Sequence, residues 1–273
     1  MDRIFATIQA ILPQHLLTHC VGWLANSKLS IIRVPFIGIF RRIYRVDLAE
    51  SDPSDPAAFD SFNAFFTRAL QPAARTIARD CVIAPADGVI SQCGTIKDGN
   101  LLQAKGQHYS VAQLLASDQE ARAFDGGSFV TIYLAPHNYH RVHVPLAAQL
   151  RRMTFVPGRL FSVSPSTTRA VPGLFTRNER VVFHLDSDAG AVALVMVGAM
   201  VVGSVATYHA GIVRGREVTT SEYQPAVKFD HAQQLAQFNV GSTVIVLFAP
   251  GGPALEPGLG PGTVLQLGDA IAR

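Results

Sequence analysis

A glycine-serine pair stands at the start of an apolar segment near the C-terminus, in the stretch QFNVGSTVIVLFAPGG (237–252). A serine hydroxyl can attack the carbonyl of the preceding residue and turn that amide into an ester, and glycine tolerates the strained backbone that this requires. Loss of the serine α-proton then expels the glycine carboxylate and leaves dehydroalanine, which hydrolyses to a pyruvoyl group and ammonia. Gly241 and Ser242 are therefore candidates for self-cleavage, although a small-residue turn is the simpler interpretation.

Self-cleavage of this kind needs a base for the serine hydroxyl and a carboxylate that orients the base. Asp87 in PADG (85–88) offers a carboxylate, although an aspartate before glycine is commonly a turn residue. His137, His140 and His143 follow at intervals of three in the stretch APHNYHRVHVP, and histidine titrates near neutrality. Three histidines also suit a transition metal. A strand would place His140 and His143 on opposite faces, and no HExxH motif accompanies them, so we expect no metal.

Two further serine interpretations can be weighed from sequence context. Ser204, in VVGSVATYH (201–209), lies inside a valine-rich strand pattern and is interpreted as structural. A hydrolase nucleophile would stand in a GxSxG elbow between a strand and a helix. Ser242 instead follows one glycine and leads into the strand pattern TVIVLF. The sequence therefore disfavours a serine hydrolase.

Composition restricts the classes of protein to consider. The chain has 273 residues, of which 48% are hydrophobic and only 16% charged, with a net charge of +3; globular domains average about 25% charged residues. The charge is too weak to predict a nucleic-acid partner. The longest apolar run, 191–203, is shorter than the ~20 residues that a membrane span needs. We expect a protein that rests on a membrane surface, and without a recognisable leader or a CxxC pair we expect it on the cytoplasmic side.

Three zones position these residues. Residues 1–46 show helical spacing, and in LSIIRVPFIGIFRRIYRV (29–46) apolar residues alternate with arginines, as in a helix lying on anionic lipid; a helical layer packed on its own domain is the alternative. Residues 47–273 open with a short helix around FNAFFTR (62–68) and continue as broken strands. We predict an α+β protein whose catalytic domain is a mainly antiparallel sandwich or barrel-like fold. The polar segment 222–239 is predicted to be a mobile loop.

Taken together, several motifs resemble bacterial phosphatidylserine decarboxylase, in the order of that family and over nearly the whole chain. The motifs that carry the resemblance are FNAFFTR, APADGVISQCGTI, LLQAKGQHYSVAQLL, YLAPHNYHRVHVP, VPGRLFSVSP, LFTRNERVV and FNVGSTVIVLFAPG.

The resemblance implies a proenzyme that cuts itself between Gly241 and Ser242 into a β chain (1–241) and an α chain (242–273). It places a charge relay for self-cleavage on Asp87, His143 and Ser242, and the decarboxylation step, including protonation of the product carbon, on His140. Ser242 would become a covalent pyruvoyl group that forms a Schiff base with phosphatidylserine and releases CO2 to give phosphatidylethanolamine. No metal or diffusible cofactor is implied.

The resemblance also implies an αβ heterodimer, a dimer of such units, and peripheral attachment to the cytoplasmic face of the inner membrane. Asn138 stands where relatives usually carry an acidic residue, and the segment before Gly241 is shortened. Two alternatives stay open: a pyruvoyl-dependent decarboxylase of a soluble amino acid, and a membrane-resting binding module that never processes.

Overall fold

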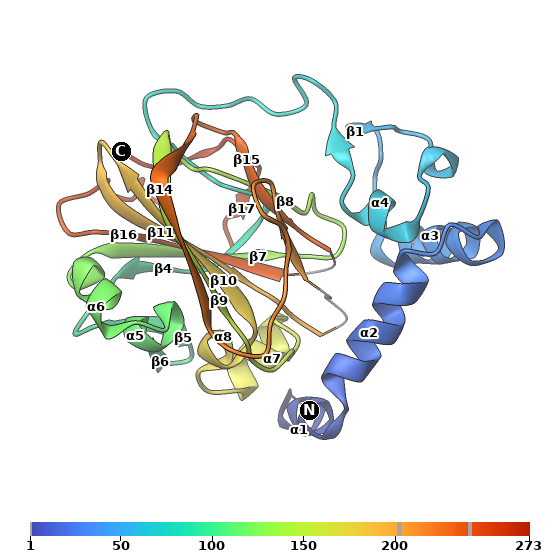
Figure 1. Ribbon diagram of the computed structural model, residues 1–273, viewed down its shortest axis with the longest axis horizontal. Coiled ribbons are helices and arrows are strands. Elements are labelled where there is room, and N and C mark those ends of the chain that lie inside the picture. The colour runs from blue at the N-terminus through green and yellow to red at the C-terminus, as the bar shows by residue number, and fades with distance from the viewer. Residues whose placement is uncertain (1, 201–203, 240–241) are drawn as a thin grey trace.

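The computed structural model describes residues 2–200, 204–239 and 242–273, and it consists of a layer of helices beside a larger β part (Figure 1). The helices of the layer are α1 (Asp2–Ile11), α2 (Gln14–Ala25), α3 (Ser30–Tyr44) and the short α4 (Phe62–Phe66). Ser61 caps α4, because its side chain accepts a hydrogen bond from the Ala64 amide. The expected α+β class is confirmed.

Two large antiparallel sheets dominate the β part, and small two-stranded sheets accompany them. The eight-stranded sheet has the order β14 (Thr219–Phe229), β9 (Ala148–Val156), β10 (Arg180–Ser187), β11 (Gly190–Val197), β16 (Ser242–Phe248), β7 (Ser128–Leu134), β4 (Gly88–Thr95) and β17 (Val264–Leu265). The four-stranded sheet has the order β13 (Gly211–Val213), β12 (Val205–Thr207), β15 (Gln234–Phe238) and β8 (Arg141–His143). In the described part of the chain, β14 and β17 each have one neighbour, so the larger sheet is not closed into a barrel, contrary to the barrel-like alternative.

Both faces of the large sheet are buried. On β7, Val130 and Ile132 face a core that includes residues of the small sheet, whereas Phe129 faces a second core under short helices and the β5–β6 hairpin. This double burial explains why these strands read as nearly continuous apolar runs. The remaining elements are β1 (Ser51–Asp52), η1 (Pro56–Ala58), β2 (Ala69–Leu70), β3 (Val82–Ile83), β5 (Asn100–Ala104), β6 (Gln107–Ser110), α5 (Val111–Leu115), α6 (Asp118–Ala121), η2 (Arg122–Phe124), α7 (Pro165–Ala170), α8 (Leu174–Arg177) and β18 (Ala270–Ala272).

The polar segment 222–239 is not the loop that its composition predicts. Most of it belongs to β14 and β15. β14 is an edge strand with mostly exposed or half-buried side chains, so its strand character leaves little hydrophobic signal. Its pairing with β9 is irregular between Glu222 and Val227, where Pro225 has no amide hydrogen to donate.

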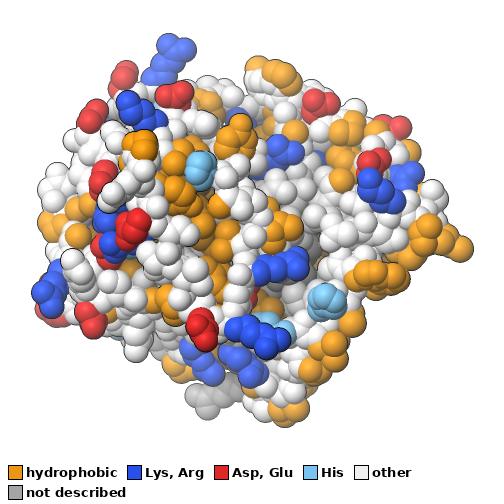
Figure 2. Space-filling model, viewed as in Figure 1, with side chains coloured by type: hydrophobic (Ala, Val, Ile, Leu, Met, Phe, Trp, Pro, Cys, Tyr) orange, Lys and Arg blue, Asp and Glu red, His pale blue; other side chains and the backbone are white. Residues whose placement is uncertain are grey.

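The helical layer has a small aromatic core of its own and an apolar outer surface. Phe36 of α3 stacks on Phe62 of α4 with ring centroids 4.0 Å apart. This core also contains Val46 and Leu48, so it crosses the boundary at residue 46, which remains a prediction. Large exposed apolar side chains gather along the edge formed by α1–α3 (Figure 2). They include Ile8, Ile11, Leu16, Trp23, Ile31 and Ile39.

Among the described residues, the longest helices remain too short or too polar to cross a bilayer.

Candidate active site

A corner between the two sheets brings the predicted site residues together. Three connections run between the sheets here, from β7 to β8, from β11 to β12 and from β15 to β16. The strand order β11-β16-β7 in the large sheet is matched by β12-β15-β8 in the small one. The chain therefore changes sheet three times side by side, and the predicted cleavage site falls on the middle connection.

Strand register puts Asp87 and Ser242 at the same end of neighbouring strands. Ser242 opens β16 and pairs with Leu134, the last residue of β7. On the other side of β7, β4 begins at Gly88, directly after Asp87. A Cβ on Gly88 would lie 2.5 Å from the Tyr133 carbonyl oxygen, so only glycine allows this approach. Gly241 and the side chain of Ser242 lie outside the described residues.

Asp87 is held by an arginine and a backbone amide. Arg75 places Nη2 2.6 Å from Oδ2 and Nε 3.1 Å from Oδ1 of the carboxylate, and the Leu267 amide donates to Oδ1 over 2.8 Å. Both members of the ion pair are buried. Burial opposes the charge of Arg75, but its hydrogen bonds to Asp87 and Glu50 outweigh burial and raise its pKa. The carboxylate is therefore fixed in place.

His143 is oriented by two partners, neither of them Asp87. Nδ1 lies 2.7 Å from the Ala232 carbonyl oxygen, and Nε2 lies 3.0 Å from the Tyr139 hydroxyl. The His143 amide donates to the Pro85 carbonyl over 2.8 Å, which ties β8 to the Asp87 turn. Burial lowers the pKa of His143, while the bond to Ala232 and the charge of Asp87 act in the opposite direction. Asp87 therefore acts on His143 through space.

His140 is completely buried against the helical layer. Its ring lies 4.0 Å from that of Phe66 on α4, and Nδ1 lies 2.8 Å from the Asn138 carbonyl oxygen. Nε2 is buried, and no described residue forms a hydrogen bond with it. Burial, and then the charge of nearby Arg68, lower the pKa of His140 to about 3. Because a carbonyl only accepts, Nδ1 carries the hydrogen and the neutral ring keeps a free lone pair on Nε2.

Asn138 closes the turn between β7 and β8. Its side-chain oxygen accepts from the Ala135 amide over 2.8 Å, and its own amide donates to the Ala135 carbonyl over 3.0 Å. An acidic side chain could accept the same bond. The asparagine therefore preserves the turn and leaves His140 without a carboxylate in this neighbouring position.

The structure brings Asp87, His140 and His143 to one corner but does not join all of them. Within the described residues, no hydrogen bond links Asp87 to His143. His137 is exposed, and its carbonyl accepts from Arg68 over 2.9 Å. The proposed role of each residue stays a prediction.

Three residues of the site were missed from the sequence. Arg68 is buried and contacts the Asn138 turn, and its Nη1 has no partner in the part of the chain that the structure describes. It ends the FFTR motif, and Tyr139 precedes His140, so both stood in stretches already singled out. Arg75 stands 12 residues before Asp87 in an irregular segment, where no periodicity indicates the pairing.

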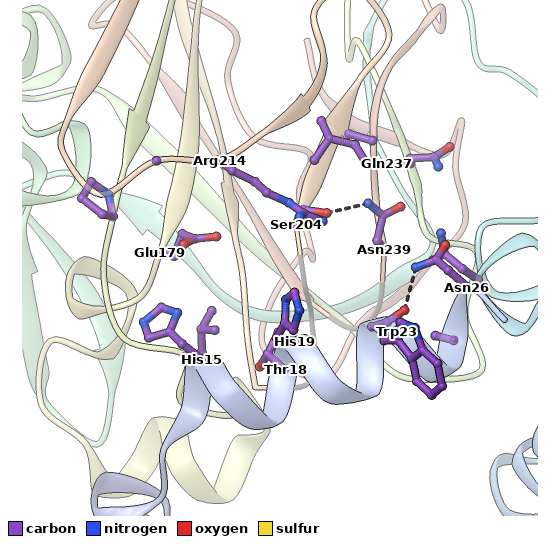
Figure 3. Close-up of a pocket in the computed structure, with 18 of the residues that line it drawn as sticks. His15, Thr18, His19, Trp23, Asn26, Glu179, Ser204, Arg214, Gln237 and Asn239 are labelled. Atoms are coloured by element: carbon purple, nitrogen blue, oxygen red, sulfur yellow. Dashed lines mark hydrogen bonds between the residues drawn. The ribbon is translucent and has the colours of Figure 1, made fainter.

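A cleft of about 1220 Å3 runs between α2 and the sheet corner (Figure 3). His15, His19 and Trp23 line it from α2, and Glu179 and Arg214 line it from the β part. Burial raises the pKa of Glu179 to about 7, against the influence of Arg214. The cleft is open toward the apolar edge of the helical layer, because Trp23 is 68% exposed.

Ser204 has a structural position at the inner end of this cleft. Its hydroxyl accepts from the Asn239 side chain over 2.7 Å, and its carbonyl accepts from the Asn239 amide over 3.1 Å (Figure 3). Asn239 stands two residues before Gly241. The β11–β12 connection thus anchors the chain that leads to the predicted cleavage site.

Comparison with known proteins identifies the family of the chain. A family model described as phosphatidylserine decarboxylase matches residues 62–273, and one described as PSD matches residues 4–45. A phosphatidylserine decarboxylase proenzyme of Pseudomonas aeruginosa (strain PAO1) is 46% identical over 99% of this chain and 97% of the relative. A protein of the same name from Shewanella sp. (strain ANA-3) is 44% identical over 100% of this chain and 97% of the relative. The chain therefore belongs to the phosphatidylserine decarboxylase family.

Proposed function

We propose that this chain is a phosphatidylserine decarboxylase, made as a proenzyme that cuts itself between Gly241 and Ser242. The observation that carries the proposal is the sheet corner. Register puts the backbone of Ser242 at the strand ends next to Asp87, the turn after β7 carries His140, and β8 carries His143. Membership of the phosphatidylserine decarboxylase family supports self-cleavage and decarboxylation as the chemistry of these neighbouring residues.

In self-cleavage, His143 takes the proton of the Ser242 hydroxyl at Nε2, and the serine oxygen attacks the Gly241 carbonyl. The neutral state that burial favours suits a base. The negative charge of Asp87 stabilises the imidazolium that forms, as the carboxylate does in a triad, although here without a direct hydrogen bond. Asn239 and Ser204 hold the chain on the glycine side of the bond.

Cleavage at this position would leave the two products within one fold. The α chain, 242–273, would consist of β16, β17 and β18, and β16 lies between β11 and β7 of the β chain. Its hydrogen bonds to both neighbours support an αβ heterodimer that stays together. Pairing of two αβ units is part of the same proposal and follows from the family resemblance.

The residues of the corner suit a pyruvoyl group at the start of β16. His140 Nε2 and Arg68 Nη1 are buried there and have no hydrogen-bond partner among the described residues, so polar atoms are available for a ligand. When formed, the pyruvoyl group supplies a carbonyl for the substrate amine and an electron sink for the pair released with CO2. His140 Nε2 takes a proton from the substrate ammonium group and returns it to the carbon that lost CO2. A ring that is neutral at physiological pH can do this because it first acts as a base.

We further propose that the substrate enters from a membrane through the cleft. The apolar edge of α1–α3 would rest on the cytoplasmic face of the inner membrane, and the cleft leads from this layer to Ser204 and Asn239 at the corner. Exposed apolar side chains with interspersed arginines are typical of helices at a lipid surface. This arrangement favours a phospholipid over a soluble amino acid as the substrate.

Release of CO2 from carboxyl-labelled phosphatidylserine tests this function. The wild type is expected to release label from phosphatidylserine in vesicles and none from free serine, and Ser242→Ala is expected to release none from either. Ser187→Ala is the matched control, because it removes a serine hydroxyl at the far end of the β10–β11 hairpin, where it donates to the Gly190 carbonyl. Release from free serine alone would favour the soluble-substrate decarboxylase, and no release from either would favour the binding module.

A further inference from the structure

Tyr139 makes a contact that the assigned roles do not use. Its hydroxyl lies 3.0 Å from Nε2 of His143. The other ring nitrogen, Nδ1, lies 2.7 Å from the Ala232 carbonyl oxygen, which can only accept a hydrogen bond. Nδ1 therefore carries the hydrogen, Nε2 carries the lone pair, and the tyrosine hydroxyl donates to it. These two contacts select one tautomer of the ring.

The position of Tyr139 links it to both other parts of the predicted relay. Its side chain is 5% exposed and packs with Ile83 and Leu267, and the Leu267 amide donates to Asp87. Along the chain, Tyr139 lies in the turn that follows Leu134, the register partner of Ser242. The tyrosine thus packs on the carboxylate side of the corner, and its turn continues from the strand that pairs with Ser242.

We propose that Tyr139 is a positioning residue for self-cleavage, which holds His143 in the neutral tautomer whose Nε2 lone pair receives the Ser242 proton. The inference rests on the proposed self-cleavage. Before the attack, the hydroxyl occupies the lone pair and keeps the ring in place. During the attack, the serine hydroxyl takes over this site on Nε2, so one hydrogen bond replaces another and the lone pair is never left unpaired in a buried site.

The groups around His143 determine whether removing the Tyr139 hydroxyl raises or lowers the pKa of the histidine. Arg141 on the same strand favours the neutral ring, and Asp87 from the facing turn favours the charged ring, while Arg75 neutralises much of the Asp87 charge. The bond from Tyr139 stabilises the neutral ring, because only that form has a lone pair on Nε2. Its removal therefore raises the pKa of His143, and less of the base is available at acidic pH.

The test is the pH dependence of self-cleavage in Tyr139→Phe. The full chain is made by cell-free translation, shifted to buffers from about pH 4 to about pH 8, and followed as it splits into two fragments. We expect the acid limb of the variant's rate profile to move up by as much as about one pH unit, with a rate loss of up to about tenfold on that limb. On the alkaline plateau, we expect the rate to change by less than about threefold. Tyr109→Phe is the matched control, because it removes the hydroxyl of a buried tyrosine in the other core.

An unshifted profile in Tyr139→Phe, or an equal shift in Tyr109→Phe, would overturn the inference and leave the proposed function intact. A wild type that never splits would instead overturn the proposed function.

A second measurement does not depend on processing. In full-length Ser242→Ala labelled with 15N-histidine, NMR should show His143 with hydrogen on Nδ1, and adding Tyr139→Phe should raise its pKa. Hydrogen on Nε2 in the Tyr139 protein, or an unchanged pKa in the double variant, would contradict the assignment.

Discussion

The sheet corner buries polar side chains, whereas the helical layer exposes apolar ones. At the corner, charged and polar groups are buried and several are held by fixed partners, as the Arg75–Asp87 pair and the ring of His143 show. In the layer, apolar side chains lie in the open, with Ile31 83% and Ile11 80% exposed. The arrangement of the corner depends on strand register, which positions individual side chains. The surface of the layer depends only on which kinds of residue are exposed. The difference indicates that chemistry belongs to the first and docking to the second.

The cleft lies between these two regions and is lined by residues of both. Trp23 lines it from the layer and Glu179 from the β part. We therefore expect a substitution at the corner to change self-cleavage or decarboxylation, and a substitution on the layer to change affinity for lipid. A substitution in the cleft wall should have a smaller effect, on the pH dependence of stability.

The largest expected effect separates the two histidines of the corner. His140→Gln should still split into two chains but lose about 10²- to 10⁴-fold in decarboxylation, because it removes the proton acceptor at Nε2. His143→Gln should fail to split. Fragment analysis by gel together with CO2 release checks both variants. If His140→Gln stays uncut while His143→Gln processes, the assignment of the two residues is reversed.

The buried ion pair should matter next. Arg75→Met leaves Asp87 with the Leu267 amide but without its cation, so the free energy of unfolding should fall by about 3 kcal/mol. Denaturant unfolding in the uncut Ser242→Ala background measures this loss without interference from processing. Arg273→Met breaks an exposed ion pair with Glu256 and serves as the control, with less than about 1 kcal/mol expected. Equal losses would show that the corner is no more dependent on its ion pair than the surface is.

A substitution on the layer should affect lipid binding alone. The double variant Ile31→Ser and Ile39→Ser removes two exposed apolar side chains of α3, and flotation with anionic vesicles should show about 10- to 100-fold weaker binding. Processing should continue, because neither residue contacts the corner. Val264→Ser removes an equally exposed side chain from β17 and should leave binding unchanged. Binding that survives the double variant would argue that the layer is not the docking surface.

The smallest effect concerns Glu179 and has a definite sign. Because its pKa is raised to about 7, the folded protein holds a proton that the unfolded chain has lost, so stability falls as the pH rises from the ordinary glutamate range through about 7. Glu179→Gln should remove this dependence and stabilise the protein by about 1 kcal/mol at alkaline pH, a gain of a few degrees in Tm. Thermal unfolding at acidic and alkaline pH measures the difference. A gain confined to acidic pH would contradict the assignment of this carboxyl.

The sequence predicted the parts of the fold that leave a periodic or motif signal. The α+β class and the helix around Phe62–Phe66 follow from apolar patterns and turn residues, and so do the inner strands β4, β7, β9, β10, β11 and β16 of the large sheet. The edge strand β14 was missed, because exposed strands carry polar side chains. Asp87, His140 and His143 could be nominated by residue type, but not the hydrogen bonds that orient them. Arg75 and Ala232 come from irregular segments, and their contacts depend on the three-dimensional path of the chain.

The intact mass of the purified protein under denaturing conditions, with Ser242→Ala beside it, shows whether the chain cuts itself at Gly241–Ser242. The account predicts two chains for the wild type, one ending at Gly241 and a smaller one beginning with a pyruvoyl group in place of Ser242, and a single uncut chain for the variant. A single uncut chain for the wild type, after prolonged incubation with lipid as well, would contradict self-cleavage at the sheet corner.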